Sequence, residues 1–192
     1  MDANFFQHLP YLEDFNAEKG TKIVSAAAIH FEPFAIYQGK ATDLGNLKEG
    51  AKIGVPNDTT NEARALLLLE AQGLIKVAED AGLTATIMDI VENPLNLEIV
   101  EIEAAQIARS LPDLDLGCIN GNYALEGGVD LSTALATEAT DSLSAETFAN
   151  IIAVQEGTEN DEKIQALVDA VKSDEVKTFI NETYAGTVVP VF

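Results

Sequence analysis

The chain has 192 residues, of which 47% are hydrophobic and 22% charged, a composition that favours a packed globular fold over disorder. Its net charge of −21, from 11 basic and 32 acidic residues, argues against binding nucleic acid, or an anionic membrane through a basic face. Cys118 is the only cysteine and His8 and His30 are the only histidines, so the sequence predicts no intrachain disulfide and no cysteine- or histidine-rich metal site.

The chain begins with a predicted strand, helix and strand. Ala3–Phe6 indicates a short strand, and Pro10 suits the first position of a helix that ends near Gly20. The apolar, small-residue run Ile23–Ile29 indicates a buried strand. Residues 38–50 are polar and contain three glycines, which predicts a connecting segment.

The next stretch reads as a strand end, a polar turn and a helix. Ile53–Val55 is short and apolar, and Pro56 stops ladder pairing. Thr59 and Glu62 have the spacing of a capping box, and the good helix formers Ala63–Leu69 follow. The sequence therefore predicts a helix that begins directly after a buried strand.

Arg64 is an unexpected residue in the first turn of this helix, where the helix dipole favours anions. Arg64 and Arg109 are the only arginines of the chain. A guanidinium beside unpaired backbone N–H groups is a good receptor for a carboxylate, through two parallel hydrogen bonds. The alternative is a surface arginine that pairs with a neighbouring acid.

The rest of the chain continues the alternation of strands and helices. Residues 133–145 are small and polar and predict a loop. The other expected elements are strands at Leu83–Ile90, Leu97–Ile102, Leu114–Ile119 and Phe148–Val154, and helices at Ala104–Leu111, Tyr123–Glu126, Asp161–Lys172 and Asp174–Tyr184. This order predicts an α/β fold with a mostly parallel sheet.

Polar residues follow two of the predicted strands. Asn57 and Asp58 come after one strand, and Asn120 opens the polar run 120–122 after another. Because open α/β sheets bind ligands at the carboxyl ends of their strands, both stretches point to one edge.

The sequence contains no motif of a nucleophilic enzyme, a P-loop, a zinc protease or a dinucleotide-binding fold, so it predicts no catalytic residue and no cofactor. Cys118 lies within a strand and is expected to be a buried, inert residue. His8 follows a strand, where it is either a hydrogen-bonded loop residue or part of a pocket.

Several polar and aromatic residues together match one kind of ligand. Arg64 suits a carboxylate, the side-chain carbonyls of Asn61, Asn120 and Asn150 suit an ammonium group, and aromatic residues suit an apolar side chain. The aromatic residues are Phe6, Tyr11 and Phe34. This inventory predicts a zwitterionic amino acid with a hydrophobic side chain.

Five stretches resemble the NlpA-type substrate-binding lipoproteins of bacterial ABC importers, the methionine-binding group. They are Asp2–His8, Pro56–Leu66, Val91–Pro94, Ile119–Ala124 and Ala149–Ile152, in this order along essentially the whole chain.

The resemblance implies a type II periplasmic-binding-protein fold of two α/β lobes, with residues 1–37 plus 151–192 in lobe one and 38–150 in lobe two. It implies that Phe6, His8 and Tyr11 contribute to the pocket, that Arg64 binds the ligand carboxylate beside Asn61, and that Asn120 and Asn150 are polar partners of the ligand. The implied role is capture of methionine between the lobes and delivery to a membrane permease, without catalysis, by a lipoprotein anchored outside the cytoplasm.

The sequence departs from the family in two respects. The family's signal peptide with its lipid-modified cysteine is not found ahead of Asp2–Phe6, and neither are its two leading β-α units. We therefore expect lobe one to be incomplete at its N-terminus, with an exposed sheet edge that favours self-association. The alternatives to an importer receptor are the effector domain of a regulator and an enzyme on a similar two-lobe fold.

Overall fold

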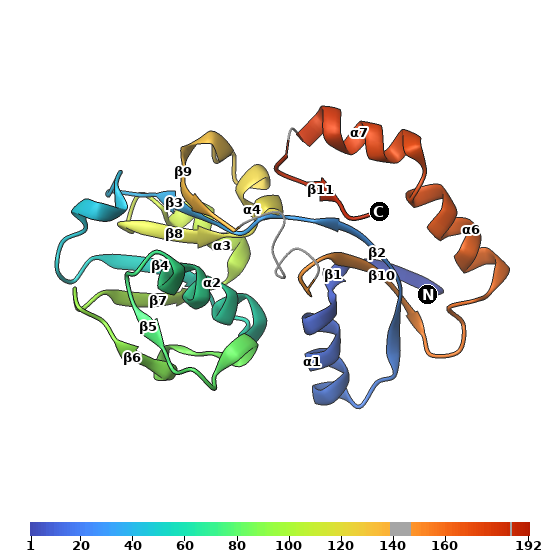
Figure 1. Cartoon of the computed structure of the whole chain (residues 1–192), viewed down its shortest axis with the longest axis horizontal. Helices are drawn as coiled ribbons and strands as arrows, with labels where there is room; N and C mark the ends of the chain where they lie inside the picture. The colour runs from blue at the N-terminus through green and yellow to red at the C-terminus, as the bar shows by residue number, and fades with distance from the viewer. Residues whose placement is uncertain (139–146, 185) are drawn as a thin grey trace. The chain divides into compact units, whose positions relative to one another are not determined.

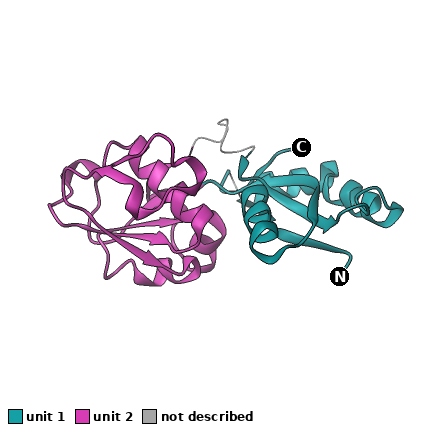
Figure 2. Cartoon of the chain, turned by 90° about the horizontal axis from the view of Figure 1, so that it is seen from below, with its two compact units in different colours: residues 1–33, 139–192 teal, residues 34–138 magenta. Residues whose placement is uncertain are grey.

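The computed structural model describes residues 1–138, 147–184 and 186–192. The chain forms two compact units, shown in separate colours in Figure 2. Unit 1 consists of residues 1–33 and 139–192, and unit 2 of residues 34–138. The resemblance implies boundaries between residues 37 and 38 and between residues 150 and 151. In the structure both boundaries come earlier in the chain, after residues 33 and 138.

Unit 1 is built on a four-stranded sheet in the order β1-β10-β2-β11. Its three ladders are all antiparallel. Because β1 and β2 both run opposite to β10, they are parallel to each other and form a β-α-β unit with α1. The bounds are β1 Ala3–His8, α1 Leu9–Lys19, β2 Ile23–Phe31, β10 Asn150–Gln155 and β11 Val189–Pro190.

Helices cover both faces of the unit 1 sheet (Figure 1). Leu12 of α1 packs with Ile151 and Ala153 of β10. The alternate residues of β10, Ile152 and Val154, pack with Ile164 of α6. Successive side chains of a strand point to opposite faces, so β10 is buried from both sides. The two C-terminal helices are α6 Glu162–Val171 and α7 Asp174–Tyr184.

Unit 2 contains a five-stranded sheet in the order β7-β4-β8-β3-β9. The central strand pairs β4·β7 and β4·β8 are parallel, whereas β3 is antiparallel to β8 and β9. The strands are β3 Ala35–Gln38, β4 Lys52–Pro56, β7 Glu98–Ile102, β8 Leu116–Ile119 and β9 Ala134–Thr137.

Helices also flank both faces of this sheet (Figure 1). On one face Leu66 and Leu69 of α2 pack with Ile53 of β4. On the other, Ile107 of α3 and Ala124 of α4 share a cluster with neighbouring strand residues. The helices are α2 Thr59–Ala71, α3 Ala104–Ser110 and α4 Gly121–Glu126.

The expectation of a mostly parallel sheet is wrong, although the α/β class is confirmed. The antiparallel strands β3, β9 and β10 are those next to the two crossings. Parallel neighbours are usually joined by a crossover helix within one sheet, whereas at these points the chain passes from one unit to the other.

The prediction of a strand at Leu83–Ile90 is also wrong. The chain forms two short 3₁₀ turns there because Gly82 has a φ of 52° and Thr86 makes a capping box with Asp89. A strand also lies within the loop expected at 133–145, whose residues 139–145 fall outside the described part. The small elements are η1 Leu44–Asn46, β5 Lys76–Val77, η2 Gly82–Thr84, η3 Ile87–Asp89, β6 Ile90–Glu92 and η4 Leu131–Thr133.

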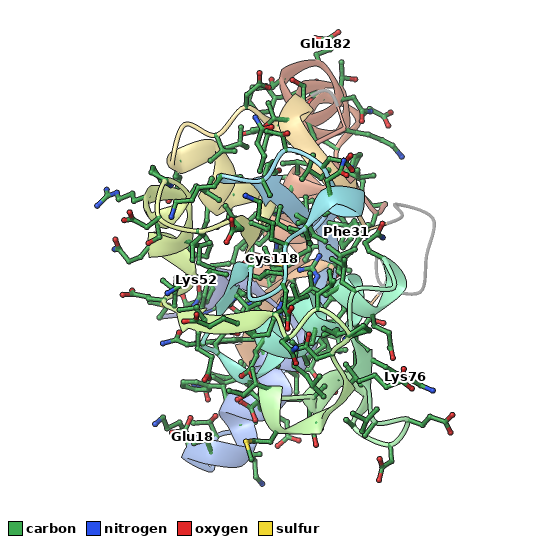
Figure 3. All side chains as sticks on the ribbon, turned by 90° about the vertical axis from the view of Figure 1, so that its left-hand side faces the viewer. Glu18, Phe31, Lys52, Lys76, Cys118 and Glu182 are labelled. Carbon is green, nitrogen blue, oxygen red and sulfur yellow. The ribbon has the colours of Figure 1, made fainter. Side chains whose placement is uncertain are left out.

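Lys52 and Lys76, labelled in Figure 3, are exposed lysines of unit 2 that pair with Glu98 and Glu92. Cys118 is fully buried in β8, and burial raises the pKa of its thiol, so it is the inert core residue that was expected. None of the described helices has the length and apolar character needed to cross a bilayer.

Candidate ligand-binding site

The start of α2 is fixed by Asp58 and not by the expected capping box. Asp58 is the N-cap, and its Oδ1 accepts hydrogen bonds from the backbone N and from Nδ2 of Asn61, at 3.1 and 2.9 Å. Thr59 is already the first helical residue and not the N-cap, so Glu62 lies one position beyond the N3 residue that would close a capping box. Glu62 accepts a bond from the backbone N of Ile87 at 2.9 Å instead.

Arg64 is buried, and it is bound to an acid that lies far away in the sequence, at the last residue of unit 2. Its side chain is 3% exposed, and that of its partner Glu138 is 8% exposed. Nε of Arg64 donates to both carboxylate oxygens of Glu138, at 2.8 and 2.9 Å, and Nη2 donates to Oε2 at 2.5 Å. Arg64 is the sixth residue of α2, so it also lies further from the positive end of the helix dipole than the sequence indicated.

Glu138 and Phe34 are the last and first residues of unit 2, and they are joined to each other and to Arg64. Glu138 N donates to Phe34 O at 2.9 Å, and Phe34 N donates to Glu138 Oε2 at 3.0 Å. The guanidinium carbon lies 5.1 Å from the centroid of the Phe34 ring, within range of a cation–π contact. The arginine is thus held by both ends of the unit.

Asn61 and Asn120 form a buried polar pair beside this arginine on α2 and the end of β8. Asn120 Nδ2 donates to Asn61 Oδ1 at 2.9 Å. Asn120 is 8% exposed, and its Oδ1 has no hydrogen-bond partner among the described residues. A buried amide oxygen without a partner costs free energy, so this atom is suited to accept a bond from a ligand.

In unit 1, polar side chains lie in register across three neighbouring strands. His8 of β1 is opposite Asn150 of β10, which is opposite His30 of β2. Nε2 of His30 lies 3.2 Å from Asn150 Nδ2 and 2.8 Å from Glu32 Oε1. His8 and Asn150 are both buried.

His8 also begins the helix that carries Tyr11. Its Nδ1 accepts a bond from the backbone N of Tyr11 at 3.2 Å and caps α1. The rings of Phe6 and Tyr11 meet edge to face with centroids 5.8 Å apart, and His8 meets Phe148 in the same way at 5.3 Å. Phe6 is exposed, so it presents apolar surface next to Tyr11.

The structure therefore brings the seven sequence-derived residues together as two groups, one within each unit. Asn61, Arg64 and Asn120 lie in unit 2, and Phe6, His8, Tyr11 and Asn150 lie in unit 1. Phe34, expected beside a ligand side chain, stacks on Arg64. Sequence reasoning missed Glu138, because among 32 acidic residues nothing local marks the one that pairs with Arg64. It also missed Glu32 and His30, whose link to Asn150 depends on the pairing of β2 with β10.

Comparison with known proteins gives close relatives. A nutrient-binding protein from Burkholderia cenocepacia, solved bound to methionine, is 43% identical with a TM-score of 0.94, over 100% of this chain and 80% of that one. A periplasmic substrate-binding protein of an ABC transporter from Coxiella burnetii is 45% identical with a TM-score of 0.92, over 100% and 79%. The D-methionine-binding lipoprotein MetQ of Escherichia coli is 40% identical, over 98% of this chain and 69% of that protein.

These relatives confirm the two-lobe α/β fold and a substrate-binding protein that is not an enzyme. The resemblance seen in five stretches of sequence extends over the whole chain, because the sequence model of one family matches residues 1–192. The chain belongs to the NlpA lipoprotein family.

Proposed function

We propose that this chain is the solute receptor of an ABC importer and that it binds a free amino acid, methionine first. The observation that carries the proposal is the buried group Asn61, Arg64 and Asn120, with one amide oxygen lacking a partner among the described residues. A methionine-bound relative and the D-methionine-binding MetQ support the choice of ligand.

Each group has a role in this proposal. Arg64 binds the ligand carboxylate, with Asn61 beside it, and Asn120 and Asn150 bind the polar groups of the ligand. Phe6, His8 and Tyr11 contact its apolar side chain. Glu32, bonded to the histidine next to Asn150, adds a carboxylate to the unit 1 group that suits an ammonium ion.

The proposal includes the partners and the location of the protein. The receptor hands its ligand to the permease of the importer, on the outer side of the cytoplasmic membrane, where the family's lipoproteins act. Self-association along β1 is also part of it, since β1 is an edge strand and Phe5 and Phe6 are exposed. Sedimentation at two concentrations tests the self-association.

Calorimetry with methionine, glutamate and lysine tests the ligand class. We expect methionine to bind at least about tenfold more tightly than the other two, because a charged side chain against Phe6 and Tyr11 loses hydration without gaining a partner. Tighter binding of glutamate or lysine would refute the proposal. Turnover of a bound amino acid would favour the enzyme alternative, and binding of none would favour another ligand class.

A further inference from the structure

Glu138 takes up one defined edge of the Arg64 guanidinium. The bonds to its carboxylate come from Nε and Nη2, which form the side edge of the planar group. A guanidinium binds a carboxylate most strongly in its own plane, through two parallel N–H bonds. The orientation of the Arg64 plane therefore decides the direction from which a ligand carboxylate can be bound.

Among the residues that the structure describes, three contacts hold that orientation. Glu138 holds the side edge, the ring of Phe34 lies 5.1 Å from the guanidinium carbon, and Phe34 N donates to the same oxygen, Oε2, that accepts from Nη2. The carboxylate is thus itself held by a backbone group and cannot turn without losing a second bond. Because the pair is buried, a misplaced guanidinium would find no water to replace the lost bonds.

We infer that Glu138 is a positioning residue for ligand binding: it orients Arg64 toward the carboxylate of the ligand. The inference rests on the proposed function and adds to it a residue that does not contact the ligand. A positioned ion pair recognises a carboxylate by direction as well as by charge. Glu138 therefore controls the preference for a free carboxylate over its uncharged derivatives.

The test compares methionine with methioninamide, which lacks the carboxylate, in the wild type and in Glu138→Asp. The aspartate keeps the charge, so the buried arginine keeps a counter-ion and the variant is expected to fold. Its carboxylate is one methylene further back and cannot reach both nitrogens in the same place. We expect the ratio of the two dissociation constants to fall by at least about fivefold, because small misplacements weaken an oriented contact strongly.

Glu98→Asp is the matched control, because Glu98 forms an exposed pair with Lys52 in the same unit, and its ratio is expected to stay unchanged. An unchanged ratio in Glu138→Asp, whether or not both affinities fall by the same factor, would overturn the inference. Equal losses would assign Glu138 to fold stability alone. A wild type that binds no methionine would instead overturn the proposed function, and this inference with it.

A second measurement needs no ligand. Exchange of the Phe34 backbone amide reports its bond to Glu138 Oε2. We expect this amide to exchange faster in Glu138→Asp while amides in the centre of β4 keep their protection, which separates local repositioning from global loss of stability. Unchanged exchange at Phe34 would show that the shorter side chain holds the same geometry, and would contradict the inference.

Discussion

Replacing Arg64 by alanine is expected to lower the free energy of unfolding by about 3 kcal/mol, because it leaves Glu138 as a buried carboxylate without a cation. The sequence alone predicts a small loss of stability or even a gain for this variant, since a cation near a helix start is unfavourable. The structure reverses this because Arg64 lies deeper in the helix and is bound to an acid. Urea unfolding measures the change.

The same variant should lose more than about 2 kcal/mol of affinity for methionine, provided that it is assayed where it remains folded. Arg64→Lys should not restore the affinity, because an ammonium group cannot form the planar fork. The double variant Arg64→Ala with Glu138→Ala should regain part of the stability, since no charge is then left unpaired.

Lys52→Ala provides the matched control, because Lys52 pairs with Glu98 at 3.2 Å on the surface of the same unit. Its cost should be at most about 1 kcal/mol, the value typical of exposed pairs. If Arg64→Ala were no more costly than Lys52→Ala, the ion pair with Glu138 would not contribute to the fold.

Glu62→Gln is expected to stabilise the protein at neutral pH. Glu62 is 5% exposed, and burial, with Glu101, Asp58 and Asp89 nearby, raises the pKa of its carboxyl above the ordinary 4.5. A glutamine can still accept the bond from Ile87 N and carries no charge. We expect a gain of about 1 kcal/mol at pH 7, or about 2–4 °C in the unfolding midpoint.

The pH dependence of this gain follows from the sign of the shift. An acid whose pKa is raised by folding binds more protons in the folded state, so it destabilises the fold increasingly as the pH rises through the folded value. Below the ordinary pKa of 4.5 the carboxyl is protonated in both states, and the advantage of glutamine should disappear.

Unfolding midpoints of Glu62→Gln and the wild type, compared at pH 7 and near pH 4, check both statements. Glu79→Gln removes one charge from an exposed position of unit 2 and is the control for net charge. An equal gain in the control would assign the effect to the net charge of −21 and not to burial. A gain that persisted at the lower pH would contradict the assignment to a raised pKa.

Local sequence was enough to predict the elements whose boundaries depend on neighbouring residues. The helix between Pro10 and Gly20, the strand from Ile23 and the two C-terminal helices are present, and Gly20 ends its helix with a φ of 65°. Proline at a helix start, glycine after its end and apolar periodicity act within one or two turns, so they can be read from the chain itself. The five stretches that resemble the family, in the same order along the chain, also identified the family.

Only the tertiary structure decided the features that join distant residues. The partner of Arg64 lies 74 residues away, and the backbone group that binds Glu62 lies 25 residues away. Strand direction at the two crossings, and the turns in place of the strand at Leu83–Ile90, also depend on what each segment packs against. The sequence by itself thus determined most local elements, the family and the residue types of the candidate site. The fold selected the acid that is buried against the arginine, one of 32 acidic residues. The physical reason is that charge pairing and burial depend on distance in space, which a local pattern does not specify.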